Sequence, residues 1–313
     1  MSGFFGILRV WLQKIRPPFL DNLSLWDLGT FFYRALSEGA VTSRAASVAF
    51  SFFMALFPGV IFVFTLIPFI PIDGFQEELF VLLQDVLPPT SFEATQSTIN
   101  DILTVQRGDL LGLTVLAALV FATNGTLALI SNFTQSVYNI GHRNFWSQYL
   151  AAFVLTALIS LLLIAGIAFL VASEGLLAAW MEHQTPLGTE WKLLIAWRYA
   201  ILIALILLSV SLVFKYGPAS KAPWRLISPG AILATVLVVA SSAAFGFYVG
   251  HFARYNQLYG SIGTLLILQL WIYINAIGLI VGYELNASVA QAHKSHSSDA
   301  SSSQTDLPNN FTA

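Results

Sequence analysis

The sequence contains no cysteine and few charged residues. Of its 313 residues, 10% are charged and 57% are hydrophobic. The absence of cysteine excludes disulfides, thiol catalysis and thiolate metal sites from this chain. An ordinary soluble domain has about 25% charged residues, so this chain carries too little charge to cover a water-exposed surface. Its mean hydropathy of +0.74 instead favours a protein that is solvated by bilayer lipid.

Recognisable catalytic and nucleic-acid-binding patterns are also missing. The formal net charge is −2, whereas a nucleic-acid-binding protein presents a clustered basic face. The five histidines fall in different loops or near the C-terminus, and no metalloprotease, paired-carboxylate, Ser-His-Asp or phosphate-loop pattern accompanies them. We therefore expect no catalytic residue, no metal, no cofactor and no nucleic-acid partner. Membrane lipid is the expected partner, and the oligomeric state stays open.

Six stretches of the sequence are apolar over the roughly 20 residues that a helix needs to cross the hydrocarbon core. They are residues 47–71, 109–131, 149–173, 193–214, 229–250 and 261–285. Pro58, Pro68 and Pro71 predict that the first span is kinked or ends early. The predicted fold class is all-α: a polytopic bundle of six transmembrane helices with extra cytoplasmic and periplasmic amphipathic helices.

The distribution of lysine and arginine predicts the orientation of this bundle. Basic residues gather before the first span and in the second and fourth loops, whereas the first loop is rich in aspartate and glutamate. Loops rich in lysine and arginine remain on the cytoplasmic side of a membrane. The sequence therefore predicts that both the N-terminus and the C-terminus are cytoplasmic.

Outside the spans the sequence predicts four further segments. Residues 1–23 have the pattern of an amphipathic interfacial helix, although a frayed tail explains them equally well. The membrane domain covers residues 24–290 and includes a helix at 24–39 that begins with a Ser24/Asp27 capping arrangement. The first loop is long enough to hold two short helices, at 77–86 and 91–105. Residues 291–313 lack periodicity and are predicted to be disordered.

Polar residues within the spans are the candidates for function, because a polar group in lipid is costly. In the sixth span Thr264, Trp271, Asn275, Gly282 and Asn286 share one helix face, and Gln269, Tyr273 and Glu284 lie roughly opposite. A helix that is polar on both sides is expected to be surrounded by protein. Four residues either line a polar path or hydrogen-bond neighbouring helices: Asn124, Thr264, Asn275 and Asn286.

Two further features of the spans suggest helix contacts. Gly278 and Gly282 form a GxxxG step, as do Gly246 and Gly250, and such steps usually mark close helix packing. The topology places Glu284 at the same depth as Arg44 and Lys215. An ion pair with one of them would reduce the cost of a carboxylate in the membrane. The alternative is that Glu284 is an interfacial carboxylate that reaches water.

Several of these segments resemble a known family. Residues 44–58, RAASVAFSFFMALFP, resemble the first-span signature of the YihY/virulence factor BrkB family, and residues 215–218, KYGP, resemble its aromatic-proline turn after the fourth span. The most specific similarity lies in the sixth span, in YGSIG at 259–263, LWIY at 270–273 and GYELN at 282–286. The resemblance covers about residues 25–290. Tyr283 departs from the pattern, because a small residue is expected there.

The resemblance implies six spans in a bacterial inner membrane, but it does not settle the function. Family members have been labelled ribonuclease BN, and others have been associated with serum resistance or proposed as lipid exporters. Our leading hypothesis is a transporter or exporter, of lipid or another amphiphile. The alternative is a non-transporting structural or envelope-maintenance protein. An enzyme is the least supported hypothesis, since the residues offer no metal-ligand set and no basic face for a ribonuclease.

Overall fold

A computed structural model describes residues 25–69, 108–138, 143–183, 189–219, 227–251 and 255–305, together with a few isolated residues between 80 and 106 and residue 141. The interfacial helix predicted for residues 1–23 lies outside this part of the chain. The two short helices predicted at 77–86 and 91–105 also lie outside it, apart from the isolated residues.

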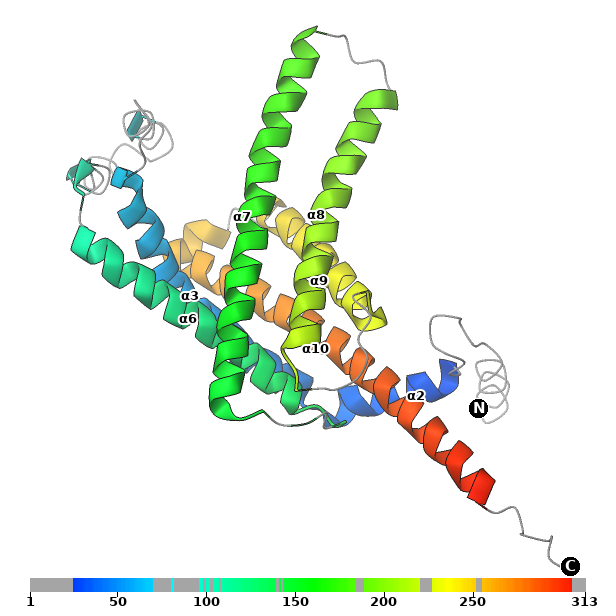
Figure 1. The fold of residues 1–313 in the computed structure, drawn as a ribbon. Helices are drawn as coiled ribbons and strands as arrows, with labels where there is room; N and C mark the ends of the chain where they lie inside the picture. The colour runs from blue at the N-terminus through cyan, green and yellow to red at the C-terminus, as the bar shows by residue number, and fades with distance from the viewer. Residues whose placement is uncertain are drawn as a thin grey trace, which may run out of the picture. The chain divides into compact units, whose positions relative to one another are not determined.

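The described residues form helices and no strand (Figure 1), which confirms the all-α fold class. In chain order the elements are α2 (Leu25–Glu38), α3 (Val41–Leu66), the 3₁₀ turn η2 (Ile67–Phe69), α6 (Gly108–Thr134), α7 (Phe145–His183), α8 (Thr189–Tyr216), α9 (Pro229–His251) and α10 (Tyr255–Thr305).

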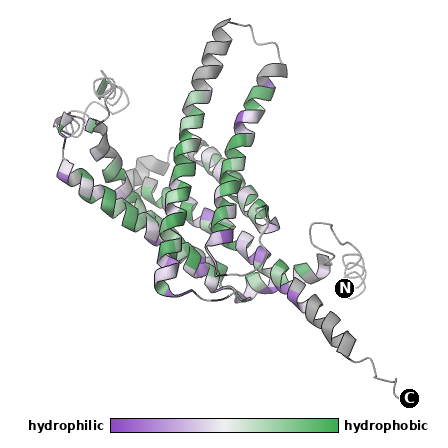
Figure 2. Ribbon diagram, in the orientation of Figure 1, coloured by the Kyte–Doolittle hydropathy of each residue, from purple (hydrophilic) through white to green (hydrophobic). Residues whose placement is uncertain are grey.

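Six of these helices are long and apolar enough to cross a membrane, as the sequence predicts. The candidate spans are Val41–Phe62, Leu111–Thr134, Phe145–Leu170, Lys192–Tyr216, Pro229–Tyr248 and Leu265–Ala292. Figure 2 shows hydrophobic residues along most of each long helix. Several boundaries differ from the prediction: the first span begins at Val41, six residues earlier, and ends at Phe62, nine residues earlier, and the sixth continues to Ala292, seven residues later. The early start of the first span places Arg44 inside it, whereas Glu284 already lies within the predicted sixth span.

The end of α3 illustrates how proline acts on the chain. Pro58 lies inside the helix, whereas the α-helix ends at Leu66 and gives way to η2, which contains Pro68. Proline lacks a backbone N–H and disfavours the helical conformation in the residue before it. The first span therefore ends early, which is one of the two outcomes that the sequence predicts.

The C-terminal end of α10 corrects the prediction of a disordered tail. α10 continues through Thr305, so residues 291–305 are helical, and only residues 306–313 lie outside the described part. The segment contains no glycine or proline before Pro308. An established helix gains one hydrogen bond for each residue it adds, and the cost of nucleation is already met by the span. Lack of periodicity alone did not reveal this.

The chain divides into two compact units. One consists of Met1–Ala49 and Leu127–Ala313, and the other of Phe50–Thr126. In the second unit α3 and α6 lie close together, because a Cβ added at Gly125 would meet the Phe52 ring at 3.1 Å. The Gln106 side chain also donates a hydrogen bond of 2.9 Å to the Pro68 carbonyl.

The first unit contains the rest of the helices. In it α2 packs against α10 through Leu28 and Ala292, with Phe31, Leu285 and Val289 around them. A second cluster joins the end of α6 to α7 and α8 and consists of Ile130, Ala152 and Leu155, packed against Leu127, Ile159 and Leu212. The closest helix contact lies between α9 and α10, where Gly230 and Gly282 meet backbone to backbone. Gly278 and Gly282 thus pack a neighbouring helix, whereas nothing lies near Gly246.

Candidate functional site

A buried ion pair joins α3 to α10 within the first unit. Arg44 Nη1 lies 2.5 Å from Glu284 Oε1, and the exposed fractions of the two side chains are 4% and 0%. The early start of α3 places Arg44 in its first turn, and the late end of the sixth span places Glu284 eight residues before Ala292. The pair is thus inside the spans. It is brought together from residues that are 240 positions apart in the sequence.

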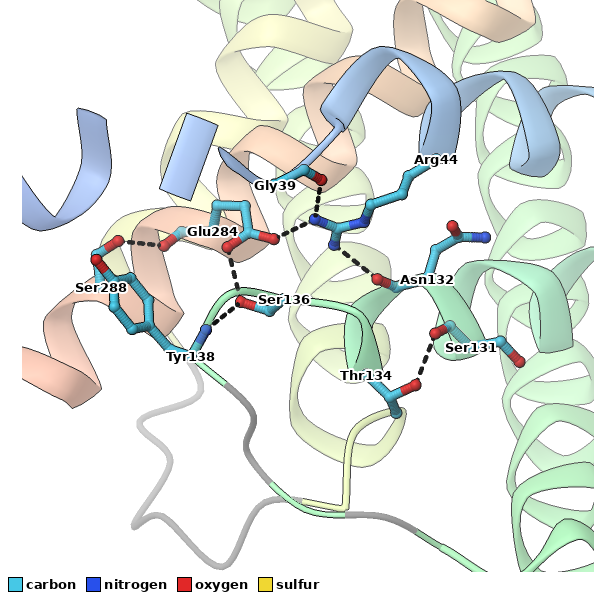
Figure 3. A network of polar contacts seen from close by, with 9 residues as sticks. All are labelled: Gly39, Arg44, Ser131, Asn132, Thr134, Ser136, Tyr138, Glu284 and Ser288. Atoms are coloured by element: carbon cyan, nitrogen blue, oxygen red, sulfur yellow. Dashed lines mark hydrogen bonds and ion pairs between the residues drawn. The ribbon is translucent and has the colours of Figure 1, made fainter. Parts of the chain in front are cut away.

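Backbone carbonyls and a serine complete the surroundings of the ion pair, which we call the Arg44–Glu284 network (Figure 3). Arg44 donates to the carbonyls of Gly39 at 3.0 Å and Asn132 at 2.6 Å. Ser136 donates its hydroxyl proton to Glu284 Oε2 at 2.7 Å. A buried charge is tolerated when its remaining hydrogen-bonding positions are also filled. Both carboxylate oxygens of Glu284 have a partner, whereas Arg44 Nε is buried without one among the described residues.

The network also fixes two chain turns. Gly39 and Ala40 connect α2 to α3, and Ala40 adopts a left-handed φ of 45°, a conformation that costs a residue with a Cβ atom. Asn132 lies in the last turn of α6, where helix carbonyls lack intrahelical partners. Arg44 therefore holds the corner before α3 and the end of α6 in a single arrangement.

Tyr138, in the segment after α6, adds a contact with α2. Its hydroxyl donates a 2.8 Å hydrogen bond to the Phe31 carbonyl of α2, and the two rings meet edge to face. Burial raises the pKa of the Tyr138 hydroxyl, while the charge of Arg34 acts in the opposite direction. The hydroxyl thus keeps the proton that it donates.

Lys215 takes no part in the ion pair. Its Nζ lies 5.1 Å from the centroid of the Tyr216 ring, where a cation–π contact is favourable. Of the two cations that the sequence offers as partners of Glu284, the structure brings Arg44 to it. With an exposed fraction of 0%, Glu284 also does not match the alternative of a carboxylate that reaches water.

Two of the candidate asparagines hydrogen-bond to the neighbouring helix α9. Asn286 accepts from the Gly230 N–H at 2.8 Å and donates to Ser228 Oγ at 2.9 Å, so it satisfies the N-terminus of α9. Asn275 accepts from the Ser241 hydroxyl at 3.0 Å and donates to the Trp271 carbonyl at 2.7 Å. Both residues act here in helix packing, one of the two roles that the sequence leaves open.

Asn124 differs from these two residues. It lies near the middle of the span Leu111–Thr134 and is exposed, and its amide has no hydrogen-bond partner among the described residues. On the same helix face lie Leu113, Leu116 and Val120, which are also exposed. The backbone of Thr264 belongs to α10, but its side chain lies outside the described part, so its role stays a prediction.

An aromatic cluster surrounds the network on the side of α6 and α8. The ring of Tyr283 stacks on that of Phe133, with centroids 4.2 Å apart, and meets the Phe214 ring at 5.9 Å. All three side chains are fully buried. Tyr283 occupies the position at which the family pattern predicts a small residue. Here the large ring fills the contact between α6, α8 and α10.

The chemistry available at this site is that of binding and charge compensation. Among the described residues, no group of three or more histidine, aspartate or glutamate side chains is placed to hold a metal ion. Several members of the network were not predicted from the sequence, notably Ser136 and the carbonyls of Gly39 and Asn132. A serine in a short connecting segment gives no signal, and a carbonyl can be assigned only once the fold is known.

Comparison with known proteins places the residues of this site within a known family. A family model described as virulence factor BrkB matches residues 32–306, which include every member of the network. The chain belongs to the BrkB family. The resemblance seen in the sequence is thereby confirmed, and with six apolar helices this BrkB-family chain is a multi-pass membrane protein.

One relative is named after an enzyme activity, and others are named only as membrane proteins. The ribonuclease-like protein YfkH of Bacillus subtilis strain 168 is 30% identical over 261 residues, which cover 83% of this chain and 93% of the relative. UPF0761 membrane proteins of Xanthomonas axonopodis pv. citri and Xanthomonas euvesicatoria pv. vesicatoria are each 25% identical over 290 residues, or 90% of this chain. The chain spans only 65% and 64% of their lengths. No solved structure is significantly similar to it.

Proposed function

We propose that this BrkB-family protein is a transporter that moves lipid or another amphiphile across a bacterial inner membrane, with both termini in the cytoplasm. The observation that carries the proposal is Asn124, whose exposed amide lies near the middle of a span and has no hydrogen-bond partner in the described part of the chain. An unsatisfied polar group costs free energy in the hydrocarbon region, so such residues are rare and commonly mark substrate paths.

The surroundings of Asn124 favour an amphiphile over a small ion. Leu113, Leu116 and Val120 are exposed on the same face of α6, with exposed fractions of 65%, 60% and 39%. An apolar face that contains a single amide can contact an acyl chain and a polar head group at the same time. An ion or a sugar would require a more continuous row of polar groups along its path.

The proposed orientation rests on the basic residues and on interfacial aromatic residues. Trp146 lies in the first turn of α7 and Tyr216 at the end of α8, and both are exposed; Arg143, just before α7, donates to the Tyr216 carbonyl. Trp and Tyr are enriched at membrane interfaces, and lysine and arginine on the cytoplasmic side. We assign this side of the membrane to the cytoplasm.

The alternative is a structural protein that transports nothing. It is favoured by Asn275 and Asn286, whose amides are engaged with α9 and are therefore not available to a substrate in this state. We propose no enzymatic activity. The ribonuclease-like name belongs to a relative that is 30% identical, and the residues described here supply no metal-ligand group of the kind a nuclease uses.

Lipid transfer in liposomes tests the proposal. The purified protein is reconstituted with a trace of a fluorescent phospholipid, and a membrane-impermeant reductant is added to quench the outer leaflet. Transport predicts that the inner-leaflet probe becomes accessible faster than in protein-free liposomes, and that Asn124→Leu slows this without lowering the amount of folded protein. Rates equal to those of protein-free liposomes, together with full activity of Asn124→Leu in cells, would support the structural role.

A further inference from the structure

In the first unit, the described side chains of the spanning helices are buried mainly toward one end of each span. Among the described side chains, the buried stretches are 44–49 in α3, 152–156 in α7, 210–214 in α8 and 230–235 in α9. In α6 burial is concentrated from Thr123 to Phe133, and in α10 from Ala276 to Ala292. Because neighbouring spans run in opposite directions, these stretches alternate between the earlier and the later part of successive spans.

Direct contacts show that the buried stretches of the first unit meet at one place. Phe133 of α6 contacts the rings of both Tyr283 and Phe214, with centroids 4.2 and 5.5 Å apart. The α6, α7 and α8 stretches share a cluster around Ile130 and Leu155. The backbones of α9 and α10 touch at their glycines. We call this place the packed end; its members include Arg44, Phe133, Ala152, Phe214, Gly230 and Glu284.

Beyond the packed end, the helices of the first unit are largely exposed. In α7 the exposed fractions of Leu161 and Leu163 are both 63%, and in α8 Leu193 and Trp197 are each 61% exposed. No buried side chain occurs from residue 157 to 170 of α7 or from 192 to 209 of α8 among those described. Helices at this level therefore have few protein neighbours. The first unit is closed at one membrane face and unclosed in the opposite half.

The contacts at the packed end are of two kinds. α9 and α10 meet through glycine backbones, where a Cβ on Gly282 would lie 2.5 Å from the Gly230 carbonyl oxygen, so this pair fits closely in one position. The first turn of α3 is held to α10 by the ion pair of Arg44 and Glu284. α6 is joined to α10 both by Ser136, just after the helix, and by the stacked rings of Phe133 and Tyr283. Breaking a polar contact costs little net free energy when water hydrates both of its groups, because each group then forms hydrogen bonds with water instead.

From this difference we infer that the Arg44–Glu284 network is a gate on the cytoplasmic side. The first turn of α3 separates from the fixed α9–α10 pair when the ion pair opens, and the packed end then admits the polar head group of the transported amphiphile. The structure described here is the state in which this gate is closed. The nature of the cargo rests on the proposed function, whereas the position of the gate rests on burial and contacts alone.

A single introduced cysteine tests the gate without background, because the chain has no cysteine of its own. Ala45 is adjacent to Arg44 and has an exposed fraction of 0%, as does Ala234 in the α9–α10 contact. Ala45→Cys and Ala234→Cys are each labelled with a membrane-impermeant maleimide in inside-out vesicles, in the otherwise unchanged protein and together with Glu284→Gln. A buried thiol reacts slowly.

The gate predicts that Glu284→Gln raises the labelling rate of Ala45→Cys about ten-fold or more, a factor that corresponds to about 1.4 kcal/mol in favour of the open state. Ala234→Cys remains unlabelled, because the α9–α10 contact stays closed. Ser136→Ala, which removes one hydrogen bond and no charge, raises the rate of Ala45→Cys in the same direction by less. It serves as the second variant if Glu284→Gln fails to fold.

Two results would overturn the inference. An unchanged rate at Ala45→Cys in folded Glu284→Gln and Ser136→Ala proteins means that the network does not control access. Equal increases at Ala45→Cys and Ala234→Cys mean that the network only stabilises the fold. The labelling rate is measured without lipid transfer. Network-dependent labelling in a protein that transfers no lipid would therefore reject the proposed function and leave the gate in place.

Discussion

Two ion pairs in the described part of the chain differ in environment. Arg44 and Glu284 are buried within the spans, whereas Arg34 and Glu38 form an exposed pair one turn apart on α2, with side-chain exposures of 61% and 53%. Two exposed charges gain little from each other because water screens them. Two buried charges depend on each other, since removing one leaves the other uncompensated.

This contrast predicts the effect of Glu284→Gln. The substitution leaves the buried guanidinium of Arg44 without its counter-charge and should lower the stability of the folded protein by on the order of 3–5 kcal/mol. Thermal unfolding in detergent measures the change. Glu38→Gln, which removes one partner of the exposed pair, serves as the control and should have little effect.

A double variant tests whether the cost arises from the unpaired charge. Arg44→Gln combined with Glu284→Gln removes both charges, so it should be more stable than Glu284→Gln alone; residues in contact show such non-additive effects. If the double variant instead shows the sum of the two single losses, the pair contributes through separate contacts and the account of a coupled pair is wrong.

How much of this site the sequence predicts depends on the type of residue. Charged residues in an apolar span are conspicuous, so Arg44 and Glu284 could be singled out and given a common depth from the order of the spans. Ser136 lies in a connecting segment and has no such signal. The choice between packing and a polar path for Asn275 and Asn286 depended on Ser241 and Gly230, whose positions only the packing of α9 against α10 determines.

At the scale of elements, the α9–α10 pair is the most closely packed contact of the first unit. A Cβ on Gly282 would lie 2.6 Å from the Ala234 Cβ, and a Cβ on Gly230 would overlap the Gly282 carbonyl oxygen and the Asn286 side chain. Small residues allow membrane helices to approach this closely, and dispersion then stabilises the pair. Asn286 adds directional hydrogen bonds to the first turn of α9.

Alanine at two glycines tests this contact. Gly282→Ala forces the two backbones apart and should destabilise the protein by roughly 1–3 kcal/mol or more, as overpacking does. Gly246→Ala on the same helix pair has nothing within 4 Å of the added methyl group and should be neutral or slightly stabilising. Equal melting temperatures for both variants would show that the two helices can separate freely.

The cap that Asn286 supplies gives a separate prediction. Asn286→Leu keeps a similar volume but leaves the Gly230 N–H and the Ser228 hydroxyl without this partner, and loss of a helix cap costs about 0.5–2 kcal/mol. We expect a lower melting temperature and a smaller loss in Asn286→Asp, which retains an acceptor for Gly230. A melting temperature for Asn286→Leu equal to that of the unmodified protein would contradict the capping role.

The length of the apolar stretches and the positions of proline predict which segments are helices, but they do not predict where these helices begin and end. Each predicted span overlaps a helix, because about 20 apolar residues in lipid have few alternatives to a helix. The ends shift where polar residues find partners within the fold: α3 begins before Arg44, and the sixth span continues beyond Asn286. An expectation based on hydropathy alone stops at such residues.

At the scale of the molecule, the proposed orientation puts the packed end at the cytoplasmic face. This orientation makes a prediction for reporter fusions. Fusions after residue 299 and within 221–225 should report cytoplasm, and fusions within 77–93 should report periplasm, because of the distribution of lysine and arginine. A cytoplasmic N-terminus with a periplasmic C-terminus would require an odd number of crossings and would contradict the six-span arrangement.

The central claim is that Asn124 faces a route that is wetted during transport and not only lipid. Asn124→Cys in intact membranes tests this directly. Leu163→Cys is the control, because the Leu163 side chain is also exposed and lies within the span of α7. A thiol in contact with water ionises and reacts, whereas one surrounded by acyl chains does not. The account predicts that a small water-soluble thiol reagent labels Asn124→Cys and leaves Leu163→Cys unlabelled. If neither cysteine is labelled, Asn124 faces lipid or another protein, and the transport route proposed here is wrong.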